Sequence, residues 1–238
     1  MFNGDLDSYM KNATESVNTR SLDMQKRFIT GTYLWMAAAL SITGITAVFC
    51  VNTNIFAYIF SSWLAVVVLV VAEFGLVWFI SARINSLSAS TASLLFFVYS
   101  TLNGLTMSII FVVYTQESIA AVFFISAGMF AGMCALGFIT KTDLTKMGNI
   151  LIMALWGIII SSLVNLFLHS SGLQWLVSFV SVIVFSGLAA WDAQKLKNIS
   201  VSSSGELRTK ASIIGALALY LDFINLFLAL LNLFGRRK

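Results

Sequence analysis

Seven long apolar segments, separated by short polar ones, follow one another along the chain. They cover residues 30–51, 55–80, 92–114, 118–139, 148–168, 173–192 and 212–233. A helix needs about 20 apolar residues to cross a bilayer core of about 30 Å. The segments are continuously apolar, whereas strands that face lipid alternate between apolar and polar residues and must close into a barrel. The pattern therefore predicts an all-α integral membrane protein with seven transmembrane helices.

The first 27 residues differ from the rest of the chain because they are polar and carry charges of both signs. They lack the apolar core of a cleaved signal peptide. Seven spans with short loops use up the remaining length, which leaves no room for a second, soluble domain. We therefore expect a polar cytoplasmic arm over residues 1–27 and a single transmembrane domain over residues 28–238.

Composition supports a membrane protein and excludes several function classes. Hydrophobic residues make up 59% of the chain and charged residues 10%, against about 45–50% and about 25% in soluble domains. The net charge of +4 does not indicate nucleic acid, because the basic residues are scattered over loop ends. No catalytic triad, Walker loop or zinc signature is present. We predict no enzyme activity and no cofactor, with the lipid bilayer as the main partner.

The distribution of Lys and Arg predicts the orientation. If the N-terminus is cytoplasmic, the loops on that side hold the basic residues of the arm, Arg83, Lys141, Lys146 and the cluster between residues 195 and 210, whereas Glu117 and His169 face the other side. This is a positive-inside pattern. The exception is the C-terminal cluster at 236–238. The last segment either re-enters the membrane and returns to the cytoplasmic side, or spans it fully. In the second case the basic cluster lies on the outer side, because the earlier loops set the orientation.

Three acidic residues lie within or at the edge of the apolar segments, namely Glu73, Asp192 and Asp222. A carboxylate at mid-bilayer costs about 2.5–3.5 kcal/mol on insertion scales, so such residues usually face the bundle interior and mark ion or proton paths. Asp222 is the most central, and Asn225 shares its helix face. Alternatively, Asp222 is a protonated carboxyl that only bonds a neighbouring helix, and Asp192 is an interfacial residue near Lys195.

If Asp192 and Asp222 approach each other, the two carboxylates cannot both ionise cheaply in a low-dielectric site, and the pair becomes a proton sensor. Arg83 lies at the cytoplasmic end of its span, level with Asp192. It either reaches a carboxylate or extends to lipid head groups. Glu73 lies ten residues earlier, about 15 Å along a helix, so it needs a separate partner.

Other residues favour structural roles. Gly128 and Gly132 form a GxxxG pair, followed by Gly137, which predicts close helix packing. Cys50 and Cys134 lie in apolar stretches without a CxxC or a nearby His and are expected to be buried structural residues. His169, the single histidine, is not expected to bind a metal or act in catalysis.

Three stretches resemble the bacterial branch of the Bax inhibitor-1 family, also called the transmembrane Bax inhibitor motif proteins. They are SAGMFAGMCALGFITKTDLTKMGNIL at 126–151, VFSGLAAWDAQKLKN at 184–198 and GALALYLDFINLFLALLNLFG at 215–235. The resemblance extends from about Lys26 to the C-terminus. It implies a bundle of six helices around a central C-terminal helix, in the bacterial inner membrane.

The resemblance also implies a function and site residues. The family is associated with a pH-sensitive calcium leak, in which Asp192 and Asp222 match a di-aspartyl sensor. By this resemblance, Arg83 matches its counter-charge and Glu73 its second-helix glutamate. Calcium prefers oxygen ligands, so we expect it as a transported ion, bound transiently by the two aspartates, with Glu73 and Asn225 as candidates along the path.

Two other functions remain open at this stage. The chain is alternatively a non-conducting regulator of a membrane protease or of a stress response, since family members have been associated with both roles. A proton-coupled transporter of an organic solute is the third possibility, which the small number of intramembrane polar groups disfavours.

Overall fold

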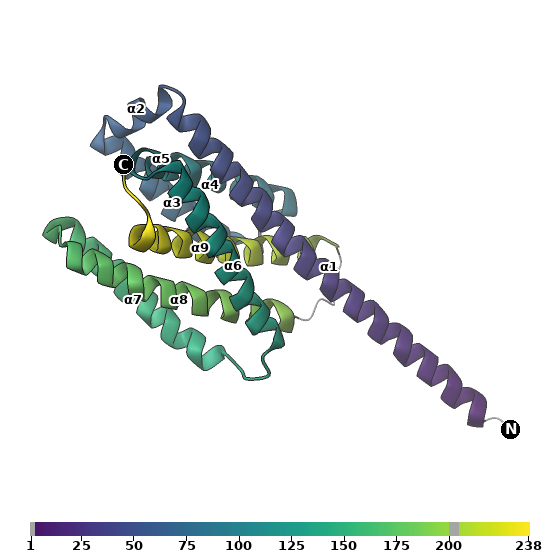
Figure 1. The fold of residues 1–238 in the computed structure, drawn as a ribbon. Helices are drawn as coiled ribbons and strands as arrows, with labels where there is room; N and C mark the ends of the chain where they lie inside the picture. The colour runs from purple at the N-terminus through teal and green to yellow at the C-terminus, as the bar shows by residue number, and fades with distance from the viewer. Residues whose placement is uncertain (1–2, 200–204) are drawn as a thin grey trace.

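A computed structural model describes residues 3–199 and 205–238 (Figure 1). This part of the chain contains nine helices: α1 (Asn3–Val51), α2 (Ile55–Phe60), α3 (Trp63–Arg83), α4 (Ala89–Met107), α5 (Ile109–Val113), α6 (Gln116–Ile139), α7 (Thr145–Leu168), α8 (Ser171–Asn198) and α9 (Gly205–Phe234). Within it, seven helical stretches are long and apolar enough to cross a membrane, with α4 and α5 together forming one. The predicted all-α membrane protein is confirmed.

Two of the predicted segments contain breaks. The apolar segment at 55–80 is divided into α2 and α3, because the Ser62 hydroxyl accepts a hydrogen bond from the Ala65 backbone N–H and so caps α3. The segment at 92–114 changes from α4 to α5 at Ser108. α8 and α9 extend beyond their apolar segments at the ends that carry Lys195 and Lys210, since charged residues continue a helix into the membrane surface. Hydropathy therefore located the spans better than the helix ends.

The polar N-terminal arm is helical from Asn3 and continues into the first span without a break. Figure 1 shows the first half of α1 projecting away from the other helices. The boundary expected near residue 27 is thus a change in surroundings, from outside the bundle to inside it, and not a change in secondary structure.

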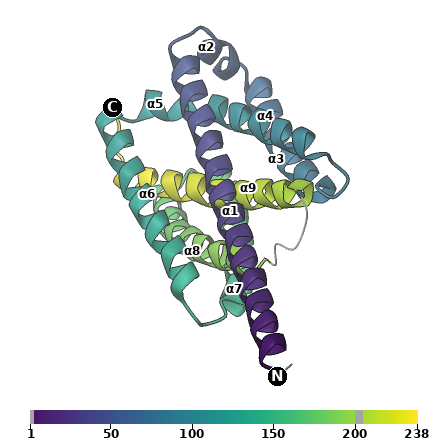
Figure 2. The ribbon, with the colours of Figure 1, turned by 90° about the vertical axis from the view of Figure 1, so that its right-hand side faces the viewer.

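α9 lies in the interior of the bundle (Figures 1 and 2). In its most apolar stretch 72% of the residues are buried, compared with 6% in α3 and 6% in α7. It packs mainly against α8, α1, α6 and α4, while α3 packs on α4 and α7 on α8. Four helices therefore form the main contacts of α9, and α3 and α7 pack outside two of them. The outer faces of α3 and α7 expose large apolar side chains, as expected for contact with lipid.

α9 runs from one end of the bundle to the other. Near its start, Glu206 accepts a hydrogen bond from the Ala89 backbone N–H and Lys210 donates to the Asn85 carbonyl. After its last turn the C-terminal tail pairs with the segment between α5 and α6, where the Thr115 N–H donates to the Arg236 carbonyl. α9 therefore runs through the bundle as a full span and does not turn back towards the end where it starts.

These contacts define two ends. The basic end holds the loops at 84–88 and 140–144 and the charged termini of α8 and α9. The C-terminal end holds the turns at 114–115 and 169–170 and the tail at 235–238. The cluster at 236–238 therefore lies opposite the other basic loops.

Close packing of α6 against α8 depends on a different glycine from those of the GxxxG pair. A Cβ atom at Gly137 would lie 2.0 Å from the Ala190 carbonyl oxygen. One at Gly128 or Gly132 would meet no atom of the other described helices within 4 Å. The prediction of close packing was therefore wrong for the GxxxG pair, which faces away from the bundle. Spacing alone does not say which helix face carries a glycine.

Candidate functional site

The structure brings Asp192 of α8 and Asp222 of α9 together. Asp222 is 6% exposed and the Asp192 side chain 14%. The two carboxyl groups interact directly across the α8–α9 interface. Asp222 faces α8 because Gly215, seven positions earlier on the same helix face, contacts Leu196 of α8.

One oxygen of this pair is left unsatisfied. Asp222 Oδ2 is buried and has no hydrogen-bond partner within the described part of the chain. A buried polar atom without a partner usually marks a bound water, an ion or a functional group. A negative charge on this buried carboxyl would be energetically unfavourable unless a proton or a cation neutralised it. The pair therefore has the chemistry to exchange protons and cations.

A lysine of the same helix connects the pair to the basic end. Lys195 Nζ donates to Asp192 Oδ1 at 3.2 Å, and the Lys195 side chain is 55% exposed. Its ammonium group also lies 4.4 Å from the centre of the Trp191 ring. Asp222 is thus joined through Asp192 to a cation whose side chain is more than half exposed.

The other predicted site residues lie elsewhere. Arg83 is exposed and makes no ion pair among the described residues, so the structure does not bring it to the aspartates. Glu73 of α3 accepts a hydrogen bond from the Thr106 hydroxyl of α4 at 2.8 Å. The Asn225 amide donates to the Leu221 carbonyl of its own helix at 2.8 Å. It shares the face of Asp222, as expected from the spacing.

A second polar cluster lies on the opposite face of α9. The Tyr220 hydroxyl donates to Asn103 Oδ1 of α4 at 2.9 Å and lies 2.7 Å from the Thr43 hydroxyl of α1. Its ring is fully buried and packs edge-on against Phe96 and Tyr99. These contacts fix the rotation of α9 about its axis, which in turn sets the direction of Asp222.

We predict that Tyr220→Phe lowers the stability of the bundle by about 0.5–2 kcal/mol, because interhelical hydrogen bonds in membranes are worth about that much. The substitution keeps the ring but leaves Asn103 Oδ1 without this donor. Unfolding in mixed micelles would measure the change. Tyr58→Phe is the matched control because Tyr58 is 85% exposed, and an equal loss in both variants would contradict the assigned role.

Sequence reasoning missed two of these residues. Lys195 was treated only as a neighbour of Asp192, although a spacing of three residues on a helix places the two side chains on one face. Tyr220 was not singled out because an aromatic residue in an apolar segment gives no signal of its own. Cys134 is buried and its thiol points to the Ala189 carbonyl at 3.7 Å, which fits the expected structural role.

Within the described residues, no three His, Cys, Asp or Glu side chains gather as they would around a bound metal. A cation at the pair would find two carboxylates and would need water or backbone oxygens to complete its shell.

Comparison with known proteins extends the structural picture. Residues 25–238 match the family model described as inhibitor of apoptosis-promoting Bax1. The chain is 47% identical to the inner membrane protein YbhL of Escherichia coli over 211 residues, 87% of this chain and 90% of that protein. It is 48% identical to an uncharacterized protein of Borreliella burgdorferi over 189 residues, 79% and 82% of the two chains.

A third relative covers nearly the whole length. An uncharacterized protein of Rickettsia prowazekii is 37% identical over 233 residues, 97% of this chain and 98% of its own. The region that matches the family model contains six of the seven spans in full, most of the first, and both aspartates of the site. The chain therefore belongs to the Bax inhibitor-1 family.

Proposed function

We propose that the protein is a pH-sensitive calcium leak of the inner membrane, with a cytoplasmic N-terminus, in which protonation of the Asp192–Asp222 pair governs cation passage. The observation that carries the proposal is the buried Asp222 carboxyl, which faces a second carboxyl and has one oxygen without a hydrogen-bond partner among the described residues. The inner-membrane location follows that of the relative YbhL.

The mechanism rests on charge balance in a low-dielectric interior. A protonated pair is neutral or nearly so and is stable between packed helices. An ionised pair places two negative charges side by side, which favours either a cation between them or separation of α8 from α9. The proton count of the pair thus biases a two-state bundle. A bias of about 1.4 kcal/mol changes the ratio of the two states about tenfold.

In this proposal the described conformation is the closed one, because Asp222 is buried. A hydrated cation needs a wider path than a carboxyl that is 6% exposed provides. Opening must therefore move α8 relative to α9, and the Asp192 side is the more accessible one because its lysine partner reaches water.

The test is calcium flux into vesicles that contain the purified protein, followed over a series of pH values, with protein-free vesicles as control. We expect flux above the control that changes with pH. Absence of flux at every pH would refute the leak. Capture of a membrane protease whose activity depends on this protein would then favour the non-conducting regulator.

The identity of the counter-charge gives a separate prediction. Lys195→Gln should move the pH at which flux changes by up to about one unit, because the cation 3.2 Å from Asp192 is lost. Arg83→Gln should leave the pH at which flux changes unaltered, since Arg83 is exposed and without an ion pair among the described residues. Both are measured by the same flux series. If Arg83→Gln shifted this pH and Lys195→Gln did not, Arg83 and not Lys195 would be the counter-charge.

A further inference from the structure

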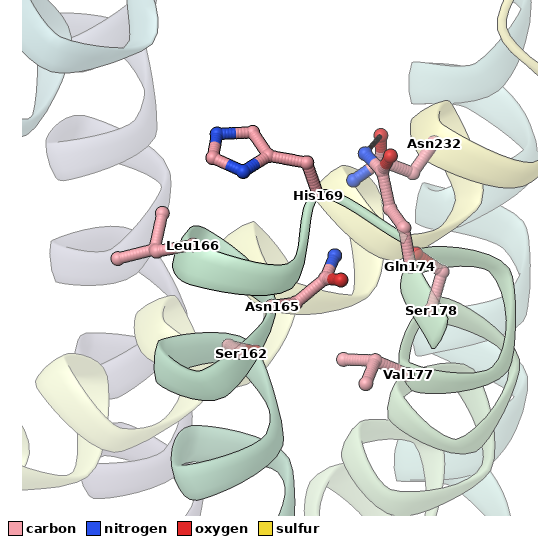
Figure 3. Close-up of a pocket in the computed structure, with 8 residues that line it drawn as sticks. All are labelled: Ser162, Asn165, Leu166, His169, Gln174, Val177, Ser178 and Asn232. Carbon is pink, nitrogen blue, oxygen red and sulfur yellow. Dashed lines mark hydrogen bonds between the residues drawn. The ribbon is translucent and has the colours of Figure 1, made fainter. Parts of the chain in front are cut away.

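A polar cavity of about 400 Å³ opens at the C-terminal end of the bundle, between the ends of α7, α8 and α9 (Figure 3). Its lining combines side-chain amides and hydroxyls with two aliphatic residues and the single histidine: Ser162, Asn165, Leu166, His169, Gln174, Val177, Ser178 and Asn232. It lies at the opposite end of the bundle from Lys195. The cavity is therefore separate from the Asp192–Asp222 pair.

Side-chain hydrogen bonds give the mouth of the cavity a fixed shape. Gln174 Nε2 donates to Asn232 Oδ1 at 3.2 Å, which ties α8 to α9 (Figure 3). The Tyr114 hydroxyl donates to the same oxygen at 3.0 Å. On the other wall, Asn165 Oδ1 accepts from the Ser170 backbone N–H at 3.0 Å. Gln174 and Asn232 are exposed, so the mouth faces water, whereas Ser178 is buried and forms the floor.

A line of polar residues leads from this floor towards the aspartate pair. On α8, Gln174, Ser178 and Ser181 follow at intervals of four and three, and further steps of four, three and four reach Asp192. Residues at such intervals share one helix face. Gln174 contacts Asn232 of α9 and Asp192 contacts Asp222 of α9. This face of α8 is therefore turned towards α9 along its whole length.

α9 presents the matching face. Asn232, Ala229, Asn225 and Asp222 are separated by three, four and three positions. We call the contact between the two faces the α8–α9 seam. Its polar members are Gln174, Ser178, Ser181 and Asp192 on α8, and Asp222, Asn225 and Asn232 on α9.

Two apolar side chains interrupt the seam. Phe185 and Leu188 occupy the positions between Ser181 and Asp192 and are 6% and 5% exposed. They lie on the same face as the polar members by the same spacing. Apolar constrictions close aqueous paths because water and ions leave them. The seam thus consists of a wet vestibule, an apolar closure and the buried carboxyl pair.

From this arrangement we propose that the cavity is the vestibule of the cation path, which takes hydrated divalent cations at amide and hydroxyl oxygens, and that Phe185 and Leu188 close the path to Asp222. The inference rests on the proposed calcium leak and adds its route and its closure. The path then crosses the bundle from the cavity, along the seam and past the aspartates, to the basic end at Lys195.

The chemistry of the lining fits brief occupancy. No residue in the described lining is acidic, and neutral oxygens hold calcium less tightly than carboxylates do. Arg237 lies 5.9 Å from the centre of the Tyr114 ring, next to the hydroxyl that bonds Asn232, and its charge further shortens the stay of a cation. A vestibule that bound calcium tightly would not conduct it.

The first experiment blocks the vestibule. Ser162→Cys is reacted with a bulky thiol reagent in detergent and then reconstituted into vesicles, where we expect most of the calcium flux to be lost. The native cysteines are buried, so wild-type protein treated in the same way is one control. Ser61→Cys is the matched control, because Ser61 is exposed in the turn between α2 and α3, outside the cavity.

The second experiment opens the closure. Leu188→Ala removes one of the two apolar side chains, and we expect calcium flux to rise severalfold, a gain that misfolded protein would not produce. Leu217→Ala is the matched control. Leu217 is 2% exposed but lies five positions before Asp222, on the other side of α9. Its truncation should leave the flux at the wild-type level.

The outcomes separate this inference from the leak itself. If wild-type protein conducts calcium but neither labelling of Ser162→Cys nor Leu188→Ala changes the flux beyond its control, the path runs elsewhere and the inference is wrong, while the leak stands. If wild-type protein conducts nothing at any pH, both are refuted.

Discussion

We expect Asp222→Asn to abolish the pH dependence of calcium flux, which is the largest functional effect that we predict. Asparagine has nearly the shape of aspartic acid but cannot ionise, so the pair loses the second charge that separates its two states. A change of about tenfold across the pH series in wild-type protein, equivalent to a bias of about 1.4 kcal/mol, should shrink to less than about twofold in the variant. Flux into vesicles at matched protein density measures it.

Asp143→Asn is the control for this experiment. Asp143 lies in the loop between α6 and α7, outside the spans, and its carboxylate accepts hydrogen bonds from the Thr145 N–H and hydroxyl at 2.9 and 2.6 Å. These bonds lower the pKa of Asp143, so it stays ionised over the pH range of the test. The control should keep the wild-type response. An unchanged response in Asp222→Asn as well would remove Asp222 from the sensor.

Gly137→Ala carries the largest expected effect on stability. The added methyl group would lie 2.0 Å from the Ala190 carbonyl oxygen and 2.9 Å from its carbon. Both obstructing atoms belong to the backbone of α8, so no side chain can turn aside and α6 must move away. We expect a loss of about 3 kcal/mol, the upper end of the cost of overpacking, measured by unfolding in mixed micelles.

Gly132→Ala supplies the comparison within the same helix. No atom lies within 4 Å of the added group, and alanine favours a helix over glycine by up to about 1 kcal/mol. This variant should be as stable as the wild type or slightly more so. Equal destabilisation of both variants would show that helix α6 packs through the GxxxG face instead.

The separation of α8 from α9 links the two predictions. Gly137 lets α6 hold α8 in place, and α8 carries Asp192 to Asp222. Because α6 moves away in Gly137→Ala, α8 loses this support, and the response of flux to pH should therefore change even in the fraction that remains folded. Gly137 and Asp222 thus both act on the position of α8.

The sequence by itself determined the membrane architecture. Seven apolar segments allow no other arrangement than membrane helices, because lipid cannot satisfy unpaired backbone groups. It also singled out Asp222, since a carboxylate inside such a segment is costly wherever the helix packs. Both conclusions depend on local composition and need no knowledge of neighbours.

Only the tertiary structure decided which residues meet. The contact of Asp192 with Asp222, expected from family resemblance, depends on how α8 and α9 are turned about their axes, as do the anchoring of Tyr220 and the exposure of Gly128 and Gly132. Hydropathy carries little information on rotation, because in lipid both faces of a helix are apolar. The same limit explains why the distance of Arg83 from Asp192 and the cavity at the C-terminal end were not foreseen. The contact of Lys195 with Asp192 needs no such knowledge, because the two residues lie three positions apart on α8.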